Sequence, residues 1–249
     1  MILKAENLSA SENGNLVFDG VSFEIEEKGI YVILSKSADE RNALAKALAG
    51  ILKLDGGSIL YKDTELSDKK ESRALKAKIG YAPQKSFLYS DMTVYEALDF
   101  TGKMRGVPTD KRVRQIKEAL EIVLLSQKGD VLIKALTPTE SKRLHLANTL
   151  IGNPSTLIFN EPTANASAED SELICDVLEM LGSKKTVLIF TEKISLANKL
   201  AKHIGIMSNG KMALWSTLEN INEKLDGDPN ALIKTFLAFS DDGAKGGKH

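Results

Sequence analysis

Residues 29–60 read GIYVILSKSADERNALAKALAGILKLDGGSIL, and this stretch decides the fold class. Its first part, Ile30–Leu34, is a continuous apolar run, which is typical of a strand buried on both faces of a sheet. A short polar loop follows, and residues 38–50 have the apolar spacing of a helix. The turn-forming segment Asp55–Gly57 then predicts a return to a strand over Ser58–Tyr61. A buried strand that passes through a short loop into a helix indicates an α/β fold.

A loop at such a junction binds nucleotide phosphates when it reads G-x-x-x-x-G-K-[ST]. The glycines let bare N–H groups close around the phosphates, the lysine reaches the outer phosphates and the hydroxyl holds Mg²⁺. The corresponding octet of this chain consists of Ser35, Lys36, Ser37, Ala38, Asp39, Glu40, Arg41 and Asn42. Both glycines, the lysine and the hydroxyl are missing from their positions. The sequence therefore predicts the frame of a phosphate-binding loop without its phosphate chemistry.

Length and composition indicate one large domain, or a core with a subdomain, that buries its own core: the chain has 249 residues. The net charge is −1, so no basic field points to nucleic acid. The start of the chain lacks a signal-peptide pattern, and no run approaches the roughly 18 apolar residues of a membrane-spanning helix. We therefore expect a cytoplasmic protein. The single Cys175 excludes a disulfide framework, and its helical spacing with Ile174 and Leu178 predicts a core residue.

Alternating strand and helix signals continue along the chain, with a purely helical stretch over about 86–150. Further strands are predicted over Val21–Ile25, Ile79–Ala82, Thr156–Phe159, Val187–Phe190, Ile204–Met207 and Lys211–Trp215. Further helices are predicted over 64–78, Val94–Met104, Lys111–Leu125, Glu140–Leu150, 168–181 and 194–202. The segment Asp241–His249 is rich in Gly, Lys and Asp and is expected to be disordered. The pattern predicts an α/β core with a helical insertion.

Five segments in register resemble the nucleotide-binding domain of an ABC transporter. They are Val21–Phe23, Leu48–Gly50 with Asp55–Gly57, Ile79–Gln84, Asn153–Pro154 with Leu157–Thr163, and Ile204–Lys211. A weaker match, Ala231–Ser240, is similar to the short tail of the ABC-2 exporter type. The resemblance implies an ABC-type P-loop NTPase fold with an antiparallel β subdomain and a helical subdomain over about 86–150. It implies an ATPase-like domain over 1–225, followed by a short C-terminal helix and flexible tail over 226–249.

The chain departs from this family at nearly every nucleotide-contacting position. Glu12 or a close neighbour stands where the family has an adenine-stacking aromatic residue, and Asn160 replaces the Walker B aspartate that holds Mg²⁺. Ser167 replaces the D-loop aspartate, and Glu192 replaces the switch histidine. The signature LSGGQ reads Leu136, Thr137, Pro138, Thr139 and Glu140.

Two family residues remain, and each allows two interpretations. The resemblance implies that Gln84 contacts metal or water and that Glu161 is the general base. Alternatively, Gln84 is a solvated loop residue and Glu161 is a carboxylate that caps the turn at Pro162. We favour the second interpretation of Glu161, because a base without a positioned phosphate has no substrate.

Two of the altered motifs read as helix capping boxes. In the first, the Ser37 hydroxyl is expected to accept from the Glu40 N–H while the Glu40 carboxylate returns to the Ser37 N–H. Asp39 and Glu40 would then place negative charge where a bound phosphate otherwise sits at the helix N-terminus. Thr137–Glu140 repeats the device, and Pro138 removes an N–H group. Arg41 keeps a positive charge, but its planar fork does not replace a lysine.

These features predict a non-catalytic, pseudo-ATPase subunit of a membrane transporter complex, without ATP, Mg²⁺ or another metal. The expected partners are a transmembrane permease and an intact ABC ATPase subunit, with the protein held at the inner face of the cell membrane. In the family, the region that corresponds to about 84–150 receives the permease. The alternatives are a weak, unconventional ATPase that uses Glu161, Arg41 and Gln84, and a soluble regulatory or scaffold protein.

Overall fold

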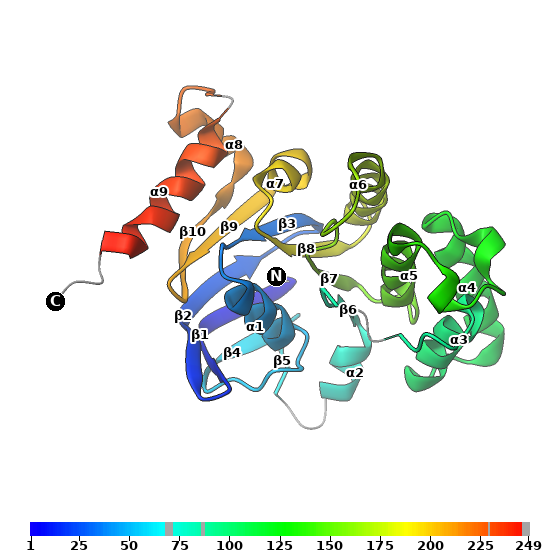
Figure 1. The fold of residues 1–249 in the computed structure, drawn as a ribbon. Coiled ribbons are helices and arrows are strands. Elements are labelled where there is room, and N and C mark those ends of the chain that lie inside the picture. The colour runs from blue at the N-terminus through cyan, green and yellow to red at the C-terminus, as the bar shows by residue number, and fades with distance from the viewer. Residues whose placement is uncertain (68–71, 86–87, 229, 246–249) are drawn as a thin grey trace.

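The computed structural model describes residues 1–67, 72–85, 88–228 and 230–245, and within them the strands form two sheets (Figure 1). The smaller sheet is antiparallel, in the order β2-β1-β4-β5. Its strands are β1 (Leu3–Glu12), β2 (Asn15–Ile25), β4 (Gly56–Tyr61) and β5 (Thr64–Glu65). The larger sheet, in the order β10-β9-β3-β8-β7-β6, is parallel except for β10. Its strands are β3 (Gly29–Leu34), β6 (Ile79–Ala82), β7 (Thr156–Asn160), β8 (Thr186–Thr191), β9 (His203–Ser208) and β10 (Lys211–Thr217).

Helices cover both faces of the larger sheet and form a separate group at one end. Helix α1 (Ala38–Leu48) lies between the two sheets and shares an apolar core with the antiparallel one. The opposite face carries α6 (Ala168–Gly182), α7 (Ile194–Leu200), α8 (Leu218–Lys224) and α9 (Ala231–Lys245). Figure 1 shows the third group beyond β6 and β7. It consists of α3 (Val94–Met104), α4 (Thr109–Ile122), α5 (Pro138–Leu150) and the short 3-10 helices Ser126–Lys128 and Ile133–Ala135.

The predicted fold class is confirmed, because a mostly parallel core carries an antiparallel sheet and a helical insertion. The apolar strands β3, β7 and β8 lie at the centre of the larger sheet with nearly every residue buried. The C-terminal ends of these strands meet at one edge, where the loop 35–37 leads into α1. This convergence brings together the residues that directly follow β3, β7 and β8.

Some predicted elements were wrong. The helix expected over 64–78 is confined to α2 (Ser72–Ala77), because Thr64–Glu65 pairs with β4 as an edge strand; residues 68–71 lie outside the described ones. Helix α9 continues to Lys245, into the tail expected to be disordered, while 246–249 lie outside the described residues. Strand β1 was not predicted. Some of its buried residues are small alanines, and its alternation of buried and exposed residues is interrupted where the register against β2 shifts.

Candidate functional site

Side chains of the loop that enters α1, and of the first turn of α1, form hydrogen bonds with one another and with the loop backbone. The N–H of Glu40 donates to the Ser37 hydroxyl at 3.2 Å, so Ser37 caps the helix as predicted. The predicted return bond from the Glu40 carboxylate to Ser37 is wrong. That carboxylate is buried, accepting from the Ser35 hydroxyl and, at 2.7 Å, from the N–H of Gly210 in the β9–β10 turn. The Ser37 N–H donates to Ser35 Oγ instead, at 3.0 Å.

Arg41 joins the ends of three neighbouring strands. Arg41 is only 4% exposed, and its Nη1 donates to the carbonyl oxygen of Ser35 at 2.5 Å, just after β3. Nε lies 3.2 Å from Glu161 Oε1, just after β7, and Nη2 lies 3.6 Å from Glu192 Oε2, after β8. Nε has no hydrogen-bond partner of good geometry among the described residues, so the contact with Glu161 is an ion pair without a directed hydrogen bond. The guanidinium therefore holds two carboxylates.

Glu161 is surrounded by protein groups. It is 3% exposed and has a left-handed backbone conformation, with φ at 51°. Its Oε2 accepts from the Thr191 hydroxyl at 3.0 Å and its Oε1 accepts from the N–H of Glu192 at 2.8 Å. These partners belong to the end of β8, so the carboxylate joins the ends of β7 and β8. The expectation that it caps the turn at Pro162 is wrong. Both oxygens of this carboxylate therefore have protein partners.

The two positions that correspond to magnesium contacts are uncharged and bonded to each other. Asn160 Nδ2 donates to Asn42 Oδ1 at 2.5 Å, and Asn160 is 3% exposed. The other amide atom, Asn160 Oδ1, is buried without a hydrogen-bond partner in the described part of the chain. No group of three or more His, Cys, Asp or Glu side chains that could hold a metal ion occurs among the described residues.

Lys36 of the loop and Glu12, at the position of the family's aromatic residue, also have protein partners. Lys36 is exposed, and its ammonium lies 6.0 Å from the centre of the Phe236 ring on α9. Glu12 pairs with Lys46 of α1 at 2.5 Å. Beside the loop, Ser37 and the β9–β10 turn border an open cleft of about 320 Å³ whose charged lining residues are Asp19, Asp39 and Glu40. In the part of the chain that the structure describes, all charged residues that line the cleft are therefore acidic.

The signature-like segment forms a complete capping box. Glu140 N–H donates to Thr137 Oγ1 at 3.2 Å, and Thr137 N–H donates to Glu140 Oε2 at 2.9 Å, as predicted. Pro138 occupies the first helical position of α5. The Thr137 N–H and the ion pair with Lys128, at 2.9 Å, lower the pKa of Glu140.

The D-loop position joins the same group. Ser167 caps α6 by accepting from Asp170 N–H at 3.1 Å. The Asp170 carboxylate also accepts from the hydroxyls of Ser167 and Thr139. The start of α6 is therefore bonded to the start of α5, and each helix has its own carboxylate at its N-terminus.

We expect Ser37→Ala and Thr137→Ala each to lower the free energy of unfolding by about 0.5–2 kcal/mol, because each removes a hydroxyl that caps a helix N-terminus. Chemical denaturation of the purified variants measures the change. Ser195→Ala is the control, since Ser195 is an exposed residue within α7, and it should stay within about 0.5 kcal/mol. Unchanged midpoints for both capping variants would contradict the self-capping interpretation.

The contribution of Glu140 should depend on pH. Because its pKa in the folded protein lies below the ordinary value of 4.5, its stabilising effect is complete above that value and is lost as the pH falls through the folded pKa. We expect the unfolding free energies of the natural chain and Glu140→Gln to differ at pH 7 and to converge in acid. A difference that is constant across the acid range would show that the Glu140 charge is not involved.

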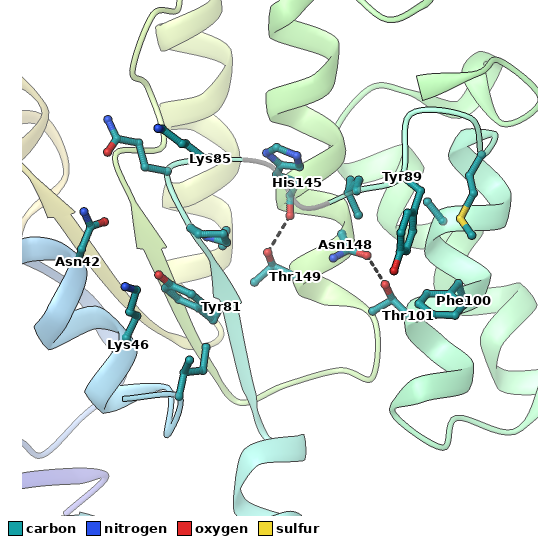
Figure 2. Close-up of a pocket in the computed structure, with 17 residues that line it drawn as sticks. Asn42, Lys46, Tyr81, Lys85, Tyr89, Phe100, Thr101, His145, Asn148 and Thr149 are labelled. Atoms are coloured by element: carbon teal, nitrogen blue, oxygen red, sulfur yellow. Dashed lines mark hydrogen bonds between the residues drawn. The ribbon is translucent and has the colours of Figure 1, made fainter. Parts of the chain in front are cut away.

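A second feature lies on the other side of α1, where Gln84 is found. This groove of about 590 Å³ lies between α1 with β6 and α3 with α5 (Figure 2). Within it, the Thr101 hydroxyl donates to Asn148 at 2.6 Å and the Thr149 hydroxyl donates to the carbonyl oxygen of His145 at 2.7 Å. Burial and the nearby Lys142 lower the pKa of His145 to about 4, so the imidazole is neutral at pH 7. Apart from Asn42, Gln84 and the strand segment that leads to Gln84, sequence reasoning named none of its residues, because they come from separate elements.

The structure therefore separates the predicted residues into three places. Ser35, Ser37, Glu40, Arg41, Glu161 and Glu192 form one network, with the Asn42–Asn160 pair beside it. Thr137, Thr139 and Glu140 form a second group with Lys128 and Asp170. Gln84 lies in the groove together with Asn42. Sequence reasoning did not identify Thr191, Gly210 or Lys128. The role of each depends on a contact between segments that are distant in the sequence.

The two sheets, the strand–loop–helix unit and the helical insertion together define an ABC-type P-loop NTPase fold. The chain belongs to the ABC transporter family, whose family model matches residues 18–164. The molybdate/tungstate import ATP-binding protein of Methanocaldococcus jannaschii is 30% identical over 96% of this chain and 77% of that protein. The linearmycin resistance ATP-binding protein of Bacillus subtilis is 25% identical over 91% of this chain and 73% of that protein.

Solved structures support the same fold. The ATP-binding subunit of an ABC transporter superposes with a TM-score of 0.83 at 16% identity, over 96% of this chain and 99% of that one. The cbiO1 subunit of Clostridium perfringens, described as part of an ABC transporter complex, gives a TM-score of 0.79 at 23% identity, over 95% and 94% of the two chains. The family and the fold predicted from the sequence are confirmed: the chain is a member of the ABC transporter ATP-binding subunits.

Proposed function

We propose that this chain is a non-catalytic subunit of an ABC transporter complex, which keeps the family fold but neither binds nor hydrolyses ATP. The observation that carries the proposal is the network around Arg41. Its guanidinium is buried against Ser35, Glu161 and Glu192, at the junction where the family motif holds phosphates. A triphosphate at this junction would have to displace these contacts and leave the buried Glu161 carboxylate without its cation.

The magnitude of the loss supports the proposal. A hydrogen bond to a charged group contributes roughly 1.5–3 kcal/mol, and a phosphate-binding loop makes several. Losing two of them weakens binding by about 10²- to 10⁴-fold. Asp39 and Glu40, which line the neighbouring cleft, would repel phosphate further. This charge pattern is unfavourable for any nucleotide polyphosphate.

The residues at the magnesium positions also fit the ion poorly. Mg²⁺ in nucleotide sites is bound through carboxylates together with substrate phosphates. Here Asn42 and Asn160 carry no charge, and they are bonded to each other at 2.5 Å. The two amides thus offer Mg²⁺ no carboxylate at this loop. We assign Glu161 a structural role, as the carboxylate that holds the end of β7 to Arg41 and to β8.

The proposed partners follow from family membership. We infer that the chain acts at the inner face of the membrane, docked on a transmembrane permease, and that it pairs with an intact ABC ATPase subunit. One wall of the groove, from Gln84 to Thr149, belongs to the region, about 84–150, that receives the permease in the family. Among the described residues, no helix is long and apolar enough to cross a bilayer.

The proposal is tested by determining the structure of the protein with ATP and Mg²⁺ at millimolar concentration. We expect Arg41 to keep its contacts with Ser35 and Glu161, and no nucleotide to lie against Ser35–Asn42. An intact family member prepared in the same way is the positive control. Clear density for a triphosphate in contact with Arg41 would overturn the proposal and favour the weak-ATPase alternative.

A further inference from the structure

A second cleft of about 590 Å³ lies at the edge of the larger sheet opposite the loop 35–37. It is bounded by the end of β2 and the turn that follows, by the starts of β3 and β9, and by the end of β10, which leads into α8 (Figure 1). Among the described residues, it shares no lining residue with the groove beside α3 or with the network around Arg41. The cleft is therefore a separate feature of the molecule.

Three aromatic side chains line this cleft. They come from three neighbouring strands, Tyr31 from β3, His203 from β9 and Trp215 from β10. The ring planes of Tyr31 and Trp215 are 6° apart with centroids 5.9 Å apart, and Tyr31 stacks on His203 at 4.9 Å. Phe23 of β2 packs against the indole, with centroids 4.7 Å apart. The partly exposed indole is thus held in place by its neighbours.

The charge around these rings is negative. In the described part of the chain, three exposed glutamates and no lysine or arginine line the cleft: Glu24, Glu26 and Glu27. Burial and the neighbouring Lys202 lower the pKa of His203, so its imidazole is neutral at pH 7. The Tyr31 hydroxyl donates to the carbonyl oxygen of Glu27 at 3.0 Å, which holds the acidic turn beside the rings.

The three carboxylates differ in their partners. Glu24 lies 3.4 Å from the ammonium of Lys4, and Glu27 pairs with Lys202. Glu26 is exposed and makes no ion pair with any described residue. Its carboxylate is therefore available to a cation from outside, close to ring faces that attract positive charge.

We propose that this cleft binds a guanidinium group, supplied either by a small guanidino compound or by an arginine side chain of a partner protein. The planar cation stacks on the Trp215 indole and donates hydrogen bonds to the Glu26 carboxylate. A guanidinium fits this surface better than an ammonium, because it is flat, more weakly hydrated and able to bond a carboxylate through two donors. The inference does not depend on the proposed lack of ATP binding, since the cleft lies at the other edge of the sheet.

Trp215 is the single tryptophan of the chain, so its fluorescence reports on this cleft. The full chain is titrated with N-acetyl-argininamide and, separately, with a short peptide that carries one arginine among uncharged residues. We expect a saturable change in the tryptophan emission. A change with both probes assigns the site to a small guanidino compound, and a change with the peptide alone assigns it to an arginine of a protein. N-acetyl-citrullinamide, which has a neutral urea in place of the guanidinium, is the matched control and should give no saturable change.

Two variants identify the groups that bind the cation. Glu26→Gln removes a charge without breaking an ion pair of the described structure, and it should weaken binding by about tenfold, because a hydrogen bond between charged groups is weakened. Glu179→Gln changes an exposed glutamate of α6 that does not line the cleft, and it should leave the affinity unchanged.

Three results would each overturn the inference: no saturable change with either arginine probe, equal binding of the citrulline compound, or an unchanged affinity in Glu26→Gln. ATP is left out of every titration, so the proposed lack of nucleotide binding is tested separately.

Discussion

Replacing Arg41 by alanine is expected to lower the free energy of unfolding by about 3–5 kcal/mol, because one cation is removed from a buried ion pair and the Glu161 carboxylate is left uncompensated. Arg41 and Glu161 are 4% and 3% exposed, so water does not replace the lost partner. In a catalytic loop of this family the corresponding residue would serve the nucleotide, and its removal would mainly affect ATP binding. Denaturant unfolding of the purified variant distinguishes a structural role of Arg41 from a ligand-binding role.

Two further variants identify the cause of the Arg41→Ala effect. Arg114→Ala removes an arginine whose side chain is 77% exposed and paired with Glu118, and it should change the stability by less than about 1 kcal/mol. Arg41→Met combined with Glu161→Gln removes both charges while Gln keeps an acceptor for Thr191, so part of the loss should be recovered. A midpoint for Arg41→Ala that matches the natural chain would contradict the structural assignment.

In a one-to-one pair with an intact ABC ATPase, turnover is expected to be about 10² times slower than in a pair of intact subunits. ATP sites of the family are composite, so the partner's own phosphate loop would face Thr137–Glu140 of this chain. That segment offers Pro138, which has no N–H, and the Glu140 carboxylate, which is held in the capping box and paired with Lys128. Preorganised donors for developing charge are each worth about 10² in rate, and this segment lacks them.

The measurement compares ATPase rates of purified complexes of known stoichiometry. Thr137→Ser, Pro138→Gly, Thr139→Gly and Glu140→Gln together restore the family signature and should raise the turnover of the mixed pair, since serine still caps α5. Denaturation of the restored chain shows that it remains folded. A natural one-to-one pair that turns over at the full rate, and loses it when Thr137–Glu140 is scrambled, would contradict this expectation.

Local sequence rules predicted some of these features and missed others for physical reasons. The Thr137–Glu140 box was predicted in full because both of its hydrogen bonds join residues within one helical turn. The Ser37–Glu40 box was only half right, because Glu40 is buried and the N–H of Gly210, 170 residues away, competes for its carboxylate. The approach is unusually close there, since a Cβ on Gly210 would lie 2.9 Å from the carbonyl oxygen of Val17.

For the ion pairs and the groove, too, single residues were predictable from the sequence and their contacts with distant segments were not. The residues Arg41, Glu161 and Glu192 were each recognised from motif positions, but nothing in the sequence indicated that one guanidinium holds both carboxylates. That arrangement depends on three parallel strands ending side by side. The sequence indicated only a broad region for permease docking and not the groove itself. The residues that line the groove come from different helices and strands, among them Lys46, Tyr81, Phe100 and Asn148.

The most direct test of the central claim is a calorimetric titration of the purified chain with ATP and Mg²⁺, beside an intact family member. The internal network around Arg41 predicts that no saturable heat of binding appears for this chain up to millimolar nucleotide, while the intact protein binds. Saturable binding at micromolar ATP, lost in Arg41→Ala that is shown to remain folded, would contradict the claim, because it would make Arg41 a nucleotide ligand instead of an internal counter-ion.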